Sequence, residues 1–186
     1  MKTHDSIHFV ILIPHPSMGA PLRAQSRFLF AAGIHGAWSF PQAAPLARVL
    51  RPLNPDELKS LAAELRSAAI GSKFSLGKPA LVPCPGFHSF FGPALDLLPP
   101  PLPYPGVLYP FPSLVLCTAL AAPVDGPLLE QSRDMPPVNP VFFRAAMVAN
   151  LAIKPLKGAG DYSFTWRIGK PRWLPSPRKS SPREIS

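Results

Sequence analysis

The chain has 186 residues, of which 47% are apolar, and it carries a formal net charge of +9. A chain of this length buries roughly 70% of its unfolded surface on folding, so it needs no metal or disulfide as a staple. Its two cysteines, Cys84 and Cys117, have mostly apolar or proline neighbours, which predicts buried free thiols. We therefore expect one globular domain in the cytoplasm.

Proline is over-represented, with 28 residues, about three times its ordinary share. Leu97–Val124 contains no charged residue and at first suggests a membrane span. Its prolines break it, however, and leave about ten uninterrupted residues where a spanning helix needs about 20. We predict no membrane span, but a proline-rich linker near 99–106 that leads into a core strand.

The positive charge is concentrated towards the C-terminus, where six Lys or Arg side chains follow residue 166 and only Glu184 opposes them. Residues 175–186 are rich in Ser, Pro and Arg, and we predict a disordered tail. Basic Ser-Pro-Arg units can bind a nucleic-acid backbone, whereas the simpler interpretation is a solvated tail.

The first half of the chain predicts two strands and two helices. Ile7–Ile13 is β-branched and nearly continuous, as a central strand would be. A helix is expected from Pro21 to about Ala32, with Gly33 as its stop. Ala37–Leu50 reads as a strand, and its prolines at 41 and 45 indicate an edge position or a bulge.

The clearest helix signal runs from Pro55 to about Ile70. Asn54 suits the N-cap, and the acidic Asp56 and Glu57 lie where the helix dipole favours negative charge. Apolar residues recur on one face, which predicts that the helix packs on the core. This stripe consists of Leu58, Leu61, Ala62, Leu65 and Ala69, and Gly71 is expected to end the helix.

The second half predicts mostly strands. Those expected are Phe74–Val82, Leu108–Ala122, Val141–Ile153 and Tyr162–Ile168, the last two joined by a Gly-containing hairpin loop over Lys154–Asp161. Ala94–Leu98 is interpreted as the start of a short helix. This order of elements predicts an α+β fold with mostly antiparallel sheets and helices packed outside them.

Two segments open with Phe-Pro and run into an apolar stretch: Phe40–Leu50 (FPQAAPLARVL) and Phe111–Leu120 (FPSLVLCTAL). The chain closes with FFRAAMVANLAIKPLKGAGDYSFTWRIGKPRWLP. Together with the element order, these stretches resemble the two-histidine (2H) phosphoesterase superfamily, and within it the 2'-5' RNA ligase and cyclic phosphodiesterase branch. The likeness covers most of residues 7–175, and it implies one two-lobed domain over residues 1–174.

In that family each half contributes a His-x-Thr/Ser motif from facing strands, and the two histidines act as base and acid without a metal or cofactor. The matching positions here are Ala44-Pro45-Leu46 and Leu114-Val115-Leu116. A two-residue shift of the second match gives Leu116-Cys117-Thr118 instead. Neither version contains a histidine, so no catalytic residue carries over. Because positioned acid–base groups contribute roughly 10²–10⁴-fold each, we expect very poor phosphodiesterase activity.

Arg48 and Thr118 remain on the faces that the resemblance assigns to the cleft, and they are our candidate anion-binding residues. The alternative is structural, with Arg48 at a solvated strand end and Thr118 as core filler. We expect a binding module for a nucleotide, RNA or a protein. The other hypothesis is an active phosphoesterase that uses a loop histidine, His15 or His88.

The five histidines lack metal-ligand spacing, so we predict no metal site.

Overall fold

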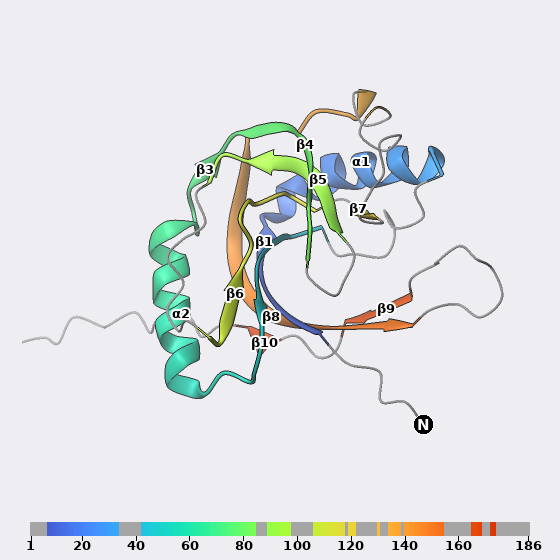
Figure 1. Cartoon of the computed structure of the whole chain (residues 1–186). Coiled ribbons are helices and arrows are strands. Elements are labelled where there is room, and N and C mark those ends of the chain that lie inside the picture. Colours follow the sequence, from blue (N-terminus) through green and yellow to red (C-terminus); the bar gives the residue numbers. More distant parts are fainter. Residues whose placement is uncertain are drawn as a thin grey trace, which may run out of the picture.

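The computed structural model describes residues 7–33, 42–84, 89–97, 106–117, 119–121, 130, 134–138, 140–154, 165–168 and 172–173. These residues form helices and antiparallel sheets, so the expected α+β class is confirmed (Figure 1). The predicted tail, the predicted hairpin loop from residue 155 on and the linker up to residue 105 lie outside the described residues. Lys154, which was expected in the loop, ends the strand that begins at Val141.

The larger sheet has seven strands, all paired antiparallel, and it is built around β1 (Ile7–Pro14) and β8 (Val141–Lys154). The others are β2 (Ala44–Val49), β3 (Lys73–Phe74), β6 (Leu108–Pro110), β9 (Thr165–Ile168) and β10 (Arg172–Trp173). The strand order is β10-β8-β1-β2-β6, and β3 and β9 also pair with β8. The predicted β1 and β8 are confirmed, whereas β10 was not predicted from the sequence.

Strand β2 lies between β1 and β6, so the predicted edge position is wrong. The predicted bulge is present: Val10 pairs with Ala47 but Ile11 pairs with Pro45, which leaves Leu46 as an extra residue in β2. A bulge interrupts the regular ladder of hydrogen bonds, and this is how an inner strand accommodates a proline that has no N–H to donate.

The smaller sheet consists of β4 (Leu76–Val82), β5 (Ser89–Leu95) and β7 (Ala119–Ala121), in the order β4-β5-β7. The helix start expected at Ala94 is wrong, because Ala94 and Leu95 belong to β5, and Leu95 pairs with Leu76 of β4. The strand predicted over Phe74–Val82 divides between the two sheets, since Phe74 in β3 pairs with β8. The pattern of apolar residues in this segment does not indicate which strand each residue pairs with.

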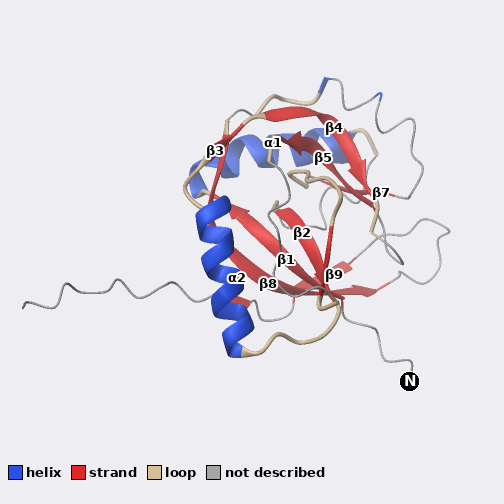
Figure 2. Cartoon of the chain, turned by 60° about the vertical axis from the view of Figure 1, so that its left-hand side comes forward, coloured by secondary structure: helices blue, strands red, loops and turns tan. Residues whose placement is uncertain are grey.

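Helix α1 (Gly19–Ala31) follows a single 3₁₀ turn (Pro16–Met18) and begins two residues before the expected Pro21. Gly33 has a φ of 88°, which suits the predicted stop because glycine adopts this conformation without strain. Helix α2 (Pro55–Ala68) agrees with the prediction. Figure 2 shows both helices outside the sheets. Among the described residues, no helix has the length and apolarity that crossing a bilayer requires.

Two interactions fix the start of α2. The Asn54 side chain accepts hydrogen bonds from the backbone N–H groups of Asp56 and Glu57, and the Glu57 carboxylate accepts one from the Asn54 N–H. Arg51 donates to both carboxylate oxygens of Glu57, at 3.0 and 2.7 Å. These hydrogen bonds lower the pKa of Glu57 to about 2, Arg51 contributing the larger effect.

Residues 111–117 connect the two sheets. Leu95 N–H donates to the Leu114 carbonyl and Cys117 N–H to the Ala43 carbonyl, so the segment is bonded to β5 on one side and to the start of β2 on the other. The rings of Phe9, Phe90 and Phe111 pack together, with Phe90 5.4 Å from each of the other two centroids. All three side chains are buried, so they form the core between the sheets.

Phe111→Ala should destabilise the protein by about 3–5 kcal/mol, because it removes a buried ring that contacts both sheets. Denaturant unfolding would measure this loss. Leu50→Ala is the matched control, since Leu50 is 54% exposed; it should change the stability by less than about 0.5 kcal/mol. Equal effects of the two substitutions would contradict the packing described.

Glu57→Gln should flatten the acid limb of the stability curve. The pKa of Glu57 is lower in the folded chain, so its contribution is complete above about pH 4.5 and is lost as the pH falls towards 2. Glutamine keeps the capping geometry but not the charge. Stability measured between pH 2 and 6 should fall less steeply in this variant than in the wild type. Glu64→Gln, on an exposed part of α2, should keep the wild-type slope.

Candidate functional site

The described parts of the two Phe-Pro segments, residues 42–50 and 111–117, lie side by side. Phe111 N–H donates to the Leu46 carbonyl at 3.0 Å, and residues 108–110 continue this antiparallel pairing with β2. Ala43 and Cys117 form a further antiparallel bridge. The segments are therefore immediate neighbours, joined by backbone hydrogen bonds.

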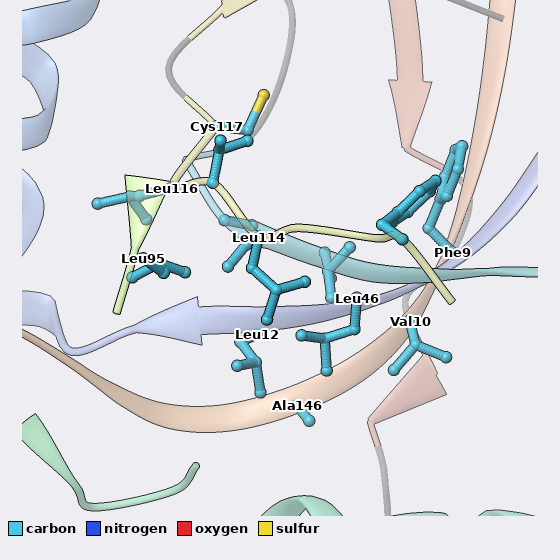
Figure 3. Close-up of a cluster of buried hydrophobic side chains, with 14 of the residues drawn as sticks. Phe9, Val10, Leu12, Leu46, Leu95, Leu114, Leu116, Cys117 and Ala146 are labelled. Carbon is cyan, nitrogen blue, oxygen red and sulfur yellow. The ribbon is translucent and has the colours of Figure 1, made fainter. Parts of the chain in front are cut away.

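The described positions matched to the first and third residues of the family's His-x-Thr/Ser motifs are part of the core. Ala44 and Leu116 are fully buried, and Leu46 and Leu114 are at most 2% exposed. Figure 3 shows Leu46, Leu114 and Leu116 within one cluster of apolar side chains, with Cys117 next to Leu116. The expected cleft between the two segments is therefore absent along the described residues. Aliphatic side chains fill the space in which a substrate would have to lie.

Arg48 is the candidate residue that the structure describes, whereas Thr118 lies outside the described residues. Arg48 is half-buried on β2, and its register partners are Phe9 on β1 and Tyr109 on β6. Residues directly opposite each other in a sheet share a face, so Arg48 projects on the same side as Phe9 and Tyr109. Phe9 is fully buried and Tyr109 is 45% exposed, which places Arg48 where the core meets the surface.

The thiol of Cys84 lies within electrostatic reach of Arg48. Burial raises the pKa of Cys84 to about 11, and the positive charge of Arg48 opposes this rise without overcoming it. Cys84 is only 2% exposed and Cys117 is fully buried, and both are free. The predicted buried free thiols are therefore confirmed.

Neither described histidine shares a site with Arg48. His8 pairs with Val49, so it lies one residue along from the Arg48 pair and on the opposite face of the sheet. His15 follows the far end of β1, roughly 20 Å along the strand from Phe9. His88, the other loop candidate, lies outside the described residues, as does His35.

His15, one of the two candidate loop histidines, forms a small polar cluster with Ser17 that was not predicted. Its Nδ1 lies 2.9 Å from the Ser17 hydroxyl oxygen and accepts a hydrogen bond from the Ser17 N–H, while its ring packs on Phe142 at 4.9 Å. His15-Pro16-Ser17 has the His-x-Ser spacing, which was the available signal. Here, however, it caps a 3₁₀ turn at the surface instead of lying on a strand.

Arg51, a further cation, has a structural role. The guanidinium of Arg51 is bonded to Glu57 and therefore serves the start of α2. Within the described part of the chain, no three His, Cys, Asp or Glu side chains gather as metal ligands would.

Comparison with protein-family models, with curated proteins and with solved structures finds no match to this chain.

The burial of the two thiols predicts that neither reacts with a water-soluble disulfide reagent in the native protein at pH 8, and that both react after unfolding. Absorbance of the released thiolate would count the reactive groups. Lys78→Cys adds a thiol at an exposed position and should react at once. Rapid native reaction of Cys84 or Cys117 would show that the core opens around them.

Proposed function

We propose that this chain is a non-catalytic binding protein for a phosphate-bearing ligand, a nucleotide or an RNA end, and that Arg48 holds the phosphate. The proposal joins the resemblance to 2H phosphoesterases with one observation: aliphatic core residues occupy the positions where that family has its histidines. Because of the bulge in β2, Arg48 lies on the face of the strand opposite to Ala44, since Arg48 pairs with Phe9 and Ala44 with Leu12. A chain that lacks both proton-transfer groups and keeps a cation elsewhere on the same strand is better suited to binding than to turnover.

The surroundings of Arg48 favour an anionic ligand. Its guanidinium has a planar arrangement of N–H donors that matches two phosphate oxygens. Because β2 is paired on both sides, Arg48 has less conformational entropy to lose when a ligand binds. Water screens the charge of a fully exposed arginine and weakens its attraction to an anion. Because Arg48 is half-buried, its charge is screened less.

Tyr109 suggests which phosphate compounds fit. It lies opposite Arg48 on the neighbouring strand, and side chains at such positions have Cβ atoms roughly 4.5–5.5 Å apart. An exposed aromatic ring beside a cation can stack on a base while the cation holds the phosphate. This combination favours a nucleotide over a simple phosphate ester.

The competing function is an active phosphoesterase that uses a loop histidine. One observation favours it, namely the hydrogen-bonded His15–Ser17 pair at the surface. That pair lies far along β1 from Arg48, so it would need a phosphate site of its own. We therefore keep it as the alternative that a turnover assay decides.

Arg48→Gln should weaken the binding of 2'- and 3'-nucleotides by about 10- to 100-fold, because it removes a charge-assisted hydrogen-bond donor. Calorimetry would measure the dissociation constants. Arg66→Gln removes an exposed arginine from α2 and serves as the charge-matched control, which should bind as the wild type does. Tyr109→Ala should weaken nucleotide binding and leave inorganic phosphate unaffected.

The same preparations should show no hydrolysis of 2',3'-cyclic nucleotides or 2'-5' linked oligonucleotides. Turnover that disappears in His15→Ala or His88→Ala would establish the enzymatic alternative. Nucleotide binding that is unchanged in Arg48→Gln would refute the proposed site.

A further inference from the structure

Helices α1 and α2 differ in the charged and capping residues at their ends. Helix α2 has a side-chain cap, acidic residues in its first turn and Arg66 in its last turn. Helix α1 has no side-chain hydrogen bond from its N-cap residue Met18, no acidic residue in the first turn and no basic residue in the last. Local stability therefore does not explain the charges that α1 carries.

One side of α1 is buried against the core. Leu22, Gln25, Ser26 and Leu29 are buried, and Leu29 packs against Phe91 of β5. Next to this buried side, on one flank of the helix, lie Arg23 and Arg27, both exposed, and Phe30, which is 44% exposed. We call these three residues the arginine face of α1.

Arg23 and Arg27 are like charges one helical turn apart, an arrangement that destabilises a helix. Residues 19–31 contain no acidic side chain. Within the described part of the chain, neither arginine forms an ion pair. The Arg23 guanidinium also folds back over Gly19, with Nη1 3.0 Å from where a Gly19 Cβ would lie, so its charge stands at the unfavourable end of the helix dipole. An external anion would relieve both conflicts.

We propose that the arginine face of α1 is a docking surface for an acidic segment of a partner protein. Carboxylates of such a segment would pair with the two guanidinium groups, and an apolar side chain would cover the exposed part of Phe30. Arginine and aromatic residues are enriched in protein–protein interfaces, where lysine is depleted, and all the charged residues of α1 are arginines.

The structure disfavours two other occupants. A membrane surface would require the apolar side of the helix, which is already in the core. A nucleic-acid strand is held by many phosphate contacts, and this face offers only the cations Arg23 and Arg27. A short peptide can place its carboxylates on the arginines alone.

This surface is separate from the Arg48 site. Arg48 pairs with Phe9 near the start of β1, whereas α1 follows the end of that strand (Figure 1). The two sites can therefore be tested, and can fail, independently of each other.

The test uses the full chain and three probes: a helical peptide with Glu residues four apart beside a Leu, the same peptide with Gln for Glu, and oligouridine. We expect the acidic peptide to bind more tightly than its Gln counterpart and to slow amide exchange over residues 19–31. In Arg23→Gln/Arg27→Gln its affinity should fall about tenfold. Arg66→Gln/Lys73→Gln, which lowers the net charge equally at exposed positions, should bind as the wild type does.

Equal loss in the two double variants would show a non-specific charge effect and overturn the proposal. Protection of α1 by oligouridine and not by the acidic peptide would also overturn it, in favour of a nucleic acid. The remaining variants separate the two sites: Arg48→Gln should leave peptide binding unchanged, and Arg23→Gln/Arg27→Gln should leave nucleotide binding unchanged. Peptide binding lost in Arg48→Gln would assign the peptide to the nucleotide site.

Discussion

The fold depends on the way residues 111–117 are held between the two sheets. This segment is hydrogen-bonded to β5 on one side and to residues 43–46 on the other, and the side chains of residues 114–117 are all buried. A polar side chain there would have to give up its hydration without a ready partner, which costs free energy. This requirement accounts for the apolar residues Leu114 and Leu116. Because the sheets pack closely around these two positions, the positions are unsuited to a side chain that transfers protons.

Proline is over-represented in this chain, and three of the prolines in its strands lie where a missing N–H donor does little harm. Pro45 lies at the bulge of β2, Pro110 ends the outer strand β6 of the larger sheet, and Pro79 lies in the outer strand β4 of the smaller one. Edge strands and bulges have backbone positions outside the regular ladder, so they tolerate proline. One outer strand of each sheet, β6 and β4, is thereby also a poor template for a further strand.

Charge is used differently in different parts of the molecule. At the start of α2, Arg51 and Glu57 neutralise each other and hold the helix end. At Arg48 the charge stands at the border of the core, next to a thiol whose pKa burial still raises. On α1 the two arginines increase local repulsion, and for this reason we connect them with an external partner and not with folding.

The sequence by itself determined those elements whose signals are local. Helix α2 was predictable because Asn54, Pro55 and Glu57 form a recognisable start, and β1 and β8 were predictable because long β-branched or apolar runs suit a strand with neighbours on both sides. Tertiary pairing decided the rest. Ala94 and Leu95 became strand because β4 lies beside them, β2 became an inner strand because a bulge accommodates Pro45, and the cleft positions became core because the two sheets close over Leu46 and Leu114. These outcomes depend on residues distant in the chain, and no local pattern contains that information.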